Sequence, residues 1–366
     1  MSKARELANL GNAYSDGALS NRNLIINGSF IVNQRNADTA VASGTGWPCD
    51  RWNVADNQSG LTQQRNGGSY TKPDGFKNYL RSIVTTATTK GAGDYAVIYQ
   101  PIEAYNIQQL NWGTSAANKA TLSFVSRSNV TGTFGGAIQN HDGSMCYPFT
   151  YTVTSADTWE EQVVVIDGAT TGAWNHDNGR GITVLWGLGV GSTYSNTAGV
   201  WTTSYTFTAT GAVDITGTLN NYLAITGVQL EIGDTATPFE HRSYGQELAL
   251  CQRYYEKLTL NTEAGAIATN GAYLASSVYK FNVTKRTLPS MSHNMTDANY
   301  SYNWGLAQAG YTVSNKSGTV GIGLGYTVDS VGMIFTGATF SPTPTALRTG
   351  WNSPYGAAEI YADAEL

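Results

Sequence analysis

Residues 227–258 read GVQLEIGDTATPFEHRSYGQELALCQRYYEKL, and this stretch decides the expected fold. It begins as a β-strand, passes through a turn at Pro238 and continues with the periodicity of a helix. Residues at spacings of four, three, four and three then form the a/d seam of a coiled coil. These positions are Tyr244, Leu248, Cys251, Tyr255 and Leu258. An isolated helix this short is marginal in water, so the seam predicts partner helices and an oligomer.

The seam alone does not determine how many chains meet in this neck, residues 243–260. Tyr and Cys at core positions do not select a strand number as Ile and Leu would, so the β-domains are expected to help choose it. We expect a homotrimer.

Composition predicts a β-rich chain with many loops. Hydrophobic residues make up 41% of the 366 residues and charged residues only 13%, while Gly (41) and Tyr (22) are used heavily. This length suits two domains with a short accessory piece. The net charge is −5 and the chain has no basic stripe to neutralise phosphates, so we expect neither nucleic-acid binding nor attachment to an anionic membrane.

The cysteines and the N-terminus indicate a protein made in a cytoplasm. Cys49, Cys146 and Cys251 are an odd number at wide spacing, which predicts reduced, partly buried thiols. The first ten residues, MSKARELANL, lack the apolar run of a signal peptide. No window approaches about 18 apolar residues, so we expect no membrane insertion.

Four segments are expected along the chain. Residues 1–22 form a short N-terminal segment, for which a helical plug and a frayed tail that orders on docking are both open. Residues 23–242 form a jelly-roll sandwich, residues 243–260 the neck, and residues 261–366 a second, distal β-sandwich. The fold class is therefore mainly β.

Short strands and turns predict the first sandwich. The strand candidates are Leu24–Phe30, Tyr79–Thr86, Tyr95–Tyr99, Ala120–Arg127 and Trp159–Ile166. Asn27-Gly28 is a turn signal within the first of them. The opening and closing segments of the sandwich are expected to meet in space. No repeat of 20 to 50 residues occurs, which argues against a solenoid.

Several stretches resemble the adhesin-type tail-fibre proteins of bacteriophages, which carry a jelly roll like that of carbohydrate-binding modules. They are NLIINGSFIVNQRN (23–36), DRW (50–52), LSFVSRSNVTGTFGG (122–136), and the short motifs VQLE, PFE and CQRYY within residues 227–258. The resemblance implies a virion protein that is made in the host bacterial cytoplasm. Its N-terminus would attach to a phage tail or baseplate protein, and the fibre would bind a host-surface glycan.

The resemblance also implies a structural Ca²⁺ between the first and last strands of the sandwich. The candidate ligands are Asn27, Gly28 and Glu231. Ser29 stands where many relatives have a carboxylate, which weakens the expected site. No other cofactor is expected.

No catalytic residues are expected. The chain has no GxSxG elbow, and His141-Asp142 and His176-Asp177 lie in Gly- and Asn-rich loops where a turn is favoured over a catalytic pair. The triplet Gly187-x-Gly189-x-Gly191 is interpreted as close backbone packing, in preference to a phosphate loop.

Aromatic residues supply the candidate glycan contacts, because sugar rings stack on flat side chains. Trp52 and Trp186 are expected in the core. Trp112 and Trp174 lie in predicted loops, where stacking on a ligand and packing over the sandwich end are both open. A third set, expected on one strand, is Tyr300, Tyr302 and Trp304 with Asn299 and Asn303 nearby. This strand is either a sugar platform or part of the distal core.

The sequence thus predicts a non-enzymatic tail-fibre protein that attaches a virion to a host glycan by noncovalent binding. Two alternatives remain. One is a glycan-degrading tail spike, and the other is a structural decoration protein of the capsid or tail.

Overall fold

The computed structural model describes residues 21–260, 264–268, 273–293, 302–306, 312–316, 319–321, 329–336, 347–351 and 358–366. The chain forms two compact units, Met1–Leu248 together with Leu366, and Ala249–Glu365. The division falls inside the expected neck. The expected N-terminal segment lies outside the described residues except for its last two positions.

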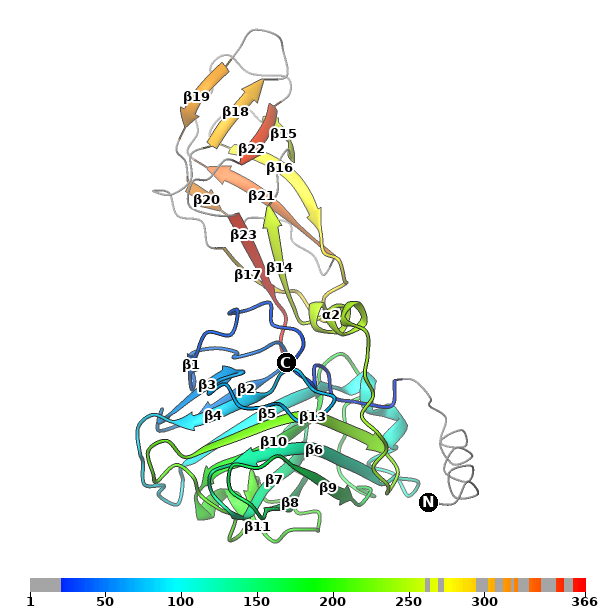
Figure 1. Ribbon diagram of the computed structural model, residues 1–366. Coiled ribbons are helices and arrows are strands. Elements are labelled where there is room, and N and C mark those ends of the chain that lie inside the picture. Colours follow the sequence, from blue (N-terminus) through cyan, green and yellow to red (C-terminus); the bar gives the residue numbers. More distant parts are fainter. Residues whose placement is uncertain are drawn as a thin grey trace. The chain divides into compact units, whose positions relative to one another are not determined.

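The first unit contains two antiparallel sheets, which lie one over the other (Figure 1). The six-stranded sheet runs β1 (Val41–Ala42), β3 (Leu61–Arg65), β4 (Leu80–Val84), β13 (Tyr222–Ile232), β6 (Ala120–Ser128) and β9 (Glu160–Ile166). The five-stranded sheet runs β2 (Asn53–Asp56), β5 (Tyr95–Glu103), β10 (Arg180–Val190), β7 (Gly132–Asn140) and β8 (Cys146–Val153). Shorter elements are η1 (Ala104–Leu110), η2 (Ser192–Tyr194) and a parallel pair, β11 (Ser195–Asn196) with β12 (Thr208–Ala209).

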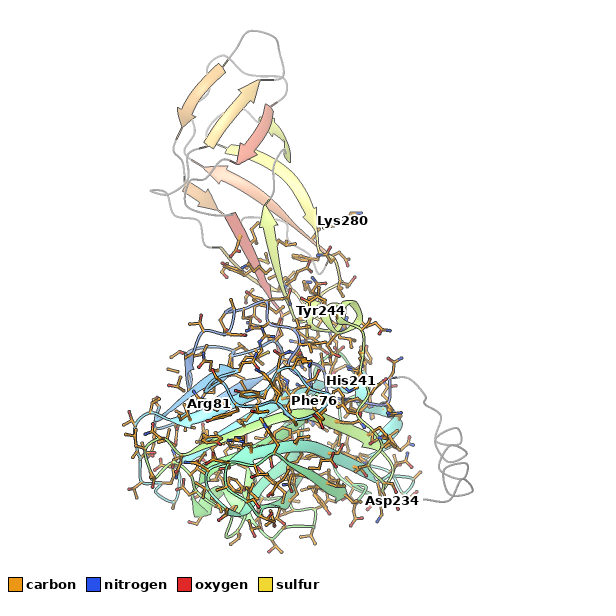
Figure 2. All side chains as sticks on the ribbon, in the orientation of Figure 1. Phe76, Arg81, Asp234, His241, Tyr244 and Lys280 are labelled. Atoms are coloured by element: carbon orange, nitrogen blue, oxygen red, sulfur yellow. The ribbon has the colours of Figure 1, made fainter. Side chains whose placement is uncertain are left out.

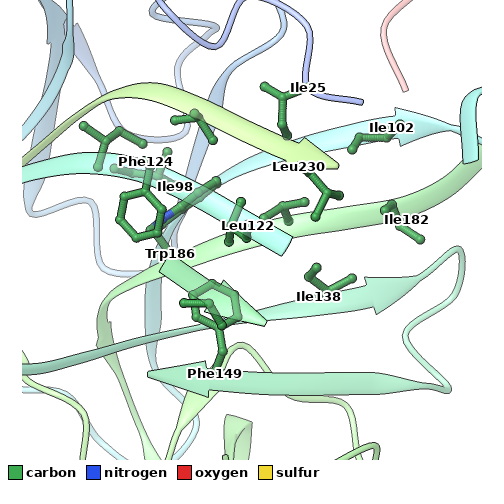
Figure 3. Packing of buried hydrophobic residues seen from close by; sticks show 14 of the residues in the cluster. Ile25, Ile98, Ile102, Leu122, Phe124, Ile138, Phe149, Ile182, Trp186 and Leu230 are labelled. Carbon is green, nitrogen blue, oxygen red and sulfur yellow. The ribbon is translucent and has the colours of Figure 1, made fainter. Parts of the chain in front are cut away.

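The core of the first unit lies between these sheets. Strand residues alternate between the two faces of a sheet, so every second residue points inward. Leu122 and Phe124 of one sheet and Trp186 of the other belong to one buried cluster (Figure 3). Trp52 and Trp186 are both fully buried, with ring centroids 5.5 Å apart, as expected from the sequence. The expected sandwich is therefore found, with strands that run from Val41 to Ile232.

The opening segment differs from its prediction. Leu24–Phe30 is not a strand, because Asn27 and Phe30 adopt positive φ values of 60° and 55°. The expected turn at Asn27 is confirmed by a hydrogen bond from Phe30 N to Asn27 O of 3.0 Å. The segment does meet the closing strand, since Leu24 N donates to Leu230 O at 2.8 Å. The other four strand candidates are found as β4, β5, β6 and β9.

Strand β13 is interrupted at Gly227. The register with β6 shifts between Thr226 and Gln229, and Gly227 has a φ of 60°. A Cβ atom there would lie 2.5 Å from the ring of Phe76, so only glycine leaves room for that ring. Phe76 in turn lies 5.6 Å from the ring of His241, and the two are neighbours in Figure 2. The strand and the segment that follows it are thus joined by ring packing.

The expected neck helix is shorter than its heptad pattern. Helix α2 spans Tyr244–Gln252, and the chain then enters β14 (Tyr255–Leu260), which pairs antiparallel with β23 (Ala358–Asp363). The prediction that Tyr255 and Leu258 continue a helical seam is therefore wrong. Pairing with a strand about a hundred residues away outweighs the local spacing, because ladder hydrogen bonds replace those of the helix.

The three seam positions that do lie on α2 have different surroundings. Tyr244 is 59% exposed, Cys251 is fully buried, and Leu248 is half-buried. A continuous five-residue seam is not formed.

The described strands of the second unit form two antiparallel sheets. The three-stranded sheet contains β14, β23 and β17 (Ser290–His293). The seven-stranded sheet runs β19 (Thr312–Lys316), β18 (Tyr302–Leu306), β22 (Leu347–Trp351), β15 (Ala264–Ala268), β16 (Tyr273–Lys280), β21 (Ser330–Thr336) and β20 (Thr319–Gly321). The whole described chain is therefore mainly β, as expected.

Candidate functional site

The outer face of the five-stranded sheet carries a second apolar cluster, separate from the core. Tyr95, Val97 and Tyr99 alternate along β5 with the core residues Ala96 and Ile98, so they face outward. The buried members of the outer cluster are Val97, Ala137, Leu185 and Phe207, and the half-buried ones are Ala55, Tyr95, Tyr99, Val190 and Tyr194. A sheet face that bears this many aromatic rings is the candidate binding surface.

Four rings on this face form a group that we call the tyrosine cluster: Tyr95, Tyr194, Tyr205 and Phe207. Phe207 is the buried centre, 4.9 Å from Tyr95, 5.0 Å from Tyr194 and 5.0 Å from Tyr205 between ring centroids. Tyr205 is 46% exposed and presents part of its ring to solvent. Burial raises the pKa of Tyr205, so its phenol stays neutral and can both donate and accept a hydrogen bond.

The segment that carries Tyr205 and Phe207 is held across the sheet by hydrogen bonds. Gln139 Nε2 donates to Thr206 O at 2.7 Å, and Cys146 N donates to Thr202 O at 2.8 Å. Strand glycines make this close approach possible, because a Cβ atom at Gly135 would lie 2.4 Å from the hydroxyl of Thr208. The tyrosine cluster is therefore positioned by the sheet beneath it.

The glycine triplet lies at the end of β10, with Gly187 and Gly189 in the strand and Gly191 just after it. Cβ atoms at Gly187 and Gly189 would lie 2.9 and 2.2 Å from the side-chain oxygens of Thr208 and Asp214. A Cβ atom at Gly191 would lie 2.1 Å from the backbone oxygen of Gly91, so the nearest neighbour is backbone at this position alone.

Two hydroxyl groups beneath this surface have no hydrogen-bond partner among the described residues. They are Oγ1 of Thr183 and Oγ1 of Thr208, and both residues are 3% exposed. Thr183 lies in the ladder between Pro101 of β5 and Gln139 of β7. Buried hydroxyls are nearly always hydrogen-bonded, and a buried water molecule is the usual partner for such groups.

The rim of the surface is the loop that joins β7 to β8. A Cβ atom at Gly143 would lie 2.1 Å from the ring of Tyr205, so this loop supports the ring. Arg180 Nε donates to His141 O at 2.8 Å, which places a guanidinium group beside the loop. Asp142 Oδ1 accepts a hydrogen bond from Ser144 N at 3.0 Å, and this bond closes a turn. The rim therefore adds polar groups next to an exposed ring.

Both His-Asp doublets are turn residues, as predicted. The carboxylate of Asp142 holds its own loop, and Asp177 Oδ1 accepts from Gly179 N at 2.8 Å in the same way. His141 Nε2 lies 3.6 Å from the Asp142 carboxylate, at the edge of the loop.

The sequence left ligand stacking and packing over the sandwich end both open for Trp112 and Trp174, and the structure buries both rings. Their exposed fractions are 4% and 9%, and both rings pack against Trp201 at 5.2 and 5.7 Å. The indole N–H groups donate to the backbone carbonyls of Asn118 and Thr171, at 2.8 and 3.1 Å. The rings are therefore used in packing, which was the alternative interpretation, and little of either face remains for a sugar.

The aromatic strand of the second unit is found in part. Tyr302, Asn303 and Trp304 lie on β18, where Tyr302 is opposite Trp351 and Trp304 is opposite Thr349 of β22. Asn299 and Tyr300 lie outside the described residues, as do the side chains of this strand. A platform on β18 stays a prediction.

The expected Ca²⁺ ligands have other roles. Asn27 Oδ1 accepts from Val32 N at 3.0 Å, and Gly28 O accepts from Val228 N at 2.9 Å. Glu231 accepts a hydrogen bond from the hydroxyl of Thr237 and lies 3.7 Å from a guanidinium nitrogen of Arg22. These oxygens are occupied within the protein, and a guanidinium already balances the carboxylate, so the residues do not fit a calcium site. In the part of the chain that the structure describes, no group of three or more His, Cys, Asp or Glu side chains converges.

The three cysteines are buried and free, as predicted. Burial raises the pKa of the Cys146 thiol to about 11, so it stays protonated and unreactive.

Sequence reasoning missed the tyrosine cluster. A signal was present on β5, where Tyr95, Val97 and Tyr99 follow a period of two, and Tyr205 and Phe207 are likewise two positions apart. Nothing in the sequence placed the two segments on one sheet face.

No protein-family model matches the chain, and no curated protein matches it. Among solved structures, the chain is similar to the enzymatically active domain of tailspike protein 4 of bacteriophage CBA120, with 14% identity and a TM-score of 0.32 over 58% of this chain and 22% of that one. It is also similar to a putative sugar-binding protein from Bacteroides thetaiotaomicron, with 13% identity and a TM-score of 0.33 over 58% of this chain and 100% of that one.

A third similar structure is the family 11 carbohydrate-binding module of Clostridium thermocellum, with 11% identity and a TM-score of 0.25 over 57% of this chain and 100% of that one. Scores this low carry no argument about this protein, and its sandwich fold rests on the topology given above. Among the described helices, none is long and apolar enough to cross a membrane.

Proposed function

We propose that this protein binds a glycan noncovalently on the outer face of the five-stranded sheet. The observation that carries the proposal is the tyrosine cluster, in which the half-exposed ring of Tyr205 packs on the buried ring of Phe207. Sugars have apolar C–H faces that stack on aromatic rings and hydroxyls that need hydrogen-bond partners. This surface offers the ring of Tyr205, and the β7–β8 loop beside it adds polar groups such as the Arg180 guanidinium.

We propose further that the protein is a bacteriophage tail-fibre protein that attaches a virion to its host. The resemblance of residues 23–258 to adhesin-type tail fibres supports this assignment. In a homotrimer, three copies of a weak site raise the effective concentration, so attachment needs no catalytic step. The His-Asp doublets support a non-enzymatic role, because their carboxylates are used to close turns.

Glycan binding can be tested with one variant and a matched control. Tyr205→Ala removes the exposed ring of the cluster, whereas Tyr105→Ala removes an equally open tyrosine, 53% exposed, from η1. Losing one stacked ring should cost on the order of 1 kcal/mol, or about fivefold in Kd. The measurement is binding of each full-length variant to an array of bacterial surface polysaccharides.

The expected result is weaker binding of Tyr205→Ala and unchanged binding of Tyr105→Ala. If both variants bind as the wild type does, the tyrosine cluster is not the site. If the wild type binds no polysaccharide on the array, the proposed function is wrong.

We propose β18 as a second contact, in the unit beyond α2. Trp304→Ala should weaken binding to host cells if the ring is a platform. Unchanged binding with a melting temperature several degrees lower would instead assign Trp304 to the distal core, because truncating a buried Trp costs about 3–5 kcal/mol.

A further inference from the structure

The two ends of the first unit lie side by side, although they are far apart in the chain. Asn21 and Glu240 are 219 positions apart and are joined by a hydrogen bond of 2.5 Å. Close by, Val228 N donates to Gly28 O at 2.9 Å. The chain therefore enters and leaves the sandwich at one place.

Charged side chains hold the entering backbone. The carboxylate of Glu240 accepts hydrogen bonds from the backbone N–H groups of Asn21 and Asn23, at 2.5 and 2.8 Å. The guanidinium of Arg242 donates to the carbonyl groups of Asn23 and Ile25, the latter at 3.0 Å. Hydrogen bonds to ionised groups are about twice as strong as neutral ones.

The contact continues into the first turn of α2. Glu247 accepts a hydrogen bond from the backbone N–H of Asn27, and its carboxylate lies 3.6 Å from Arg242 Nη1. The Arg242 and Glu247 side chains are only 8% and 7% exposed. Little water competes for these bonds, which strengthens them. We call Glu240, Arg242 and Glu247 the terminal clamp.

The order of these contacts decides how they respond to force. Glu240 is hydrogen-bonded to Asn21 and Asn23, Arg242 to Asn23 and Ile25, and Glu247 to Asn27. The residue numbers therefore increase in the same direction along both segments. The two segments therefore run parallel. Tension between the chain before Asn21 and the chain after α2 slides them past each other, which loads all the bonds at once. An antiparallel pair held by the same ends would instead open one bond at a time.

We propose that the terminal clamp carries tension between the N-terminal end of the first unit and α2. The sandwich between residues 28 and 239 then lies outside the load path and stays folded while the ends are pulled. The proposal does not depend on glycan binding.

The test is constant-force pulling of the full-length chain by its two termini. Rupture of the clamp exposes about 211 residues of sandwich to the load, so unfolding should add roughly 75 nm at about 3.6 Å per extended residue. Arg242→Gln should shorten the lifetime before this step about tenfold or more, because it removes a charge-assisted set of bonds. Arg65→Gln is the matched control, since Arg65 pairs with Asp38 and donates to Phe30 O at 3.0 Å outside the clamp.

A second pulling direction separates mechanical load from general stability. Cysteines introduced as Ala87→Cys and Ser155→Cys lie in exposed loops of the sandwich, and the three native cysteines are buried. Pulling there loads the sandwich itself, so Arg242→Gln should leave that lifetime nearly unchanged. Equal shortening in both directions, or no difference from Arg65→Gln, would overturn the proposal.

Glu240→Gln is a second clamp variant, which keeps the test possible if Arg242→Gln does not fold. It keeps one of the two acceptor oxygens and removes the other together with the charge, so it should fold with the wild-type circular dichroism spectrum and show a shorter lifetime in terminal pulling alone. A wild-type lifetime in this folded variant would also overturn the proposal.

Discussion

Replacing Lys285 by methionine should destabilise the second unit by about 3–5 kcal/mol, the usual cost of leaving one buried charge without its partner. The side chains of Lys285 and Glu256 form an ion pair in which both are 0% exposed. The ammonium also donates to Gln252 O at 2.6 Å and to Val283 O at 2.9 Å. Methionine keeps the length of the side chain but leaves the carboxylate and both carbonyl groups without this donor.

Hydrogen exchange of the amides in β14 is the appropriate assay, because Glu256 is the second residue of that strand. At about 1.4 kcal/mol per factor of ten, Lys285→Met should speed exchange about a hundredfold or more. Glu256→Gln in the same chain removes the stranded charge while keeping an acceptor for Asn282 N, now bonded at 2.9 Å. The double variant should therefore recover part of the loss.

Lys257→Met is the matched control, one position along β14. Lys257 pairs with Glu359 at 2.5 Å, but the two side chains are 35% and 18% exposed. An ion pair open to solvent contributes about 0–1 kcal/mol, so exchange should change less than tenfold. Equal effects of Lys285→Met and Lys257→Met would refute the claim that burial makes the first pair decisive.

Oligomeric state, catalysis and pH response can each be measured on the full chain. Light scattering should give about three times the monomer mass of 39.1 kDa, and a monomer mass would exclude the homotrimer. Purified protein should release no reducing sugar from host polysaccharide; release that is lost on joint replacement of His176 and Asp177 by Ala would identify a glycan-degrading spike. Burial raises the pKa of Asp56, but hydrogen bonds from backbone N–H groups and the Lys90 ammonium outweigh it, so the pKa is lowered below 3.8 in the folded state. The stability from Asp56 is therefore lost as pH falls from about 4 through this folded pKa, and Asp56→Asn should flatten that part of a melting-temperature profile.

Local sequence patterns were sufficient to predict several strands and two core residues. The alternation in residues 159–166 predicted β9, which alternates between buried and exposed residues at the edge of its sheet. Residues 120–127 were also predicted as a strand, and β6 is found there, buried at nearly every position. Trp52 and Trp186 were expected in the core from their size and surroundings, and both are fully buried.

The same reasoning was wrong where a distant segment competes with a local preference. The heptad spacing through Tyr255 and Leu258 is a real pattern, yet those residues pair with Asp363 and Ile360 of β23. For Trp112 the sequence left ligand stacking and packing both open, and only the contacts with Trp174 and Trp201 decided for packing. Neither partner is visible from a window of neighbouring residues.

The sequence by itself determined the class of the protein: mainly β, with a sandwich in its N-terminal part, buried free thiols and His-Asp doublets in turns. Each of these follows from composition or from spacing within a few residues. Only the tertiary structure decided where α2 ends, and it alone placed Tyr205 beside Tyr95 and Arg242 beside Asn23. These contacts join residues that are a hundred or more positions apart, and their free energy depends on which sheet faces meet, which no local pattern encodes.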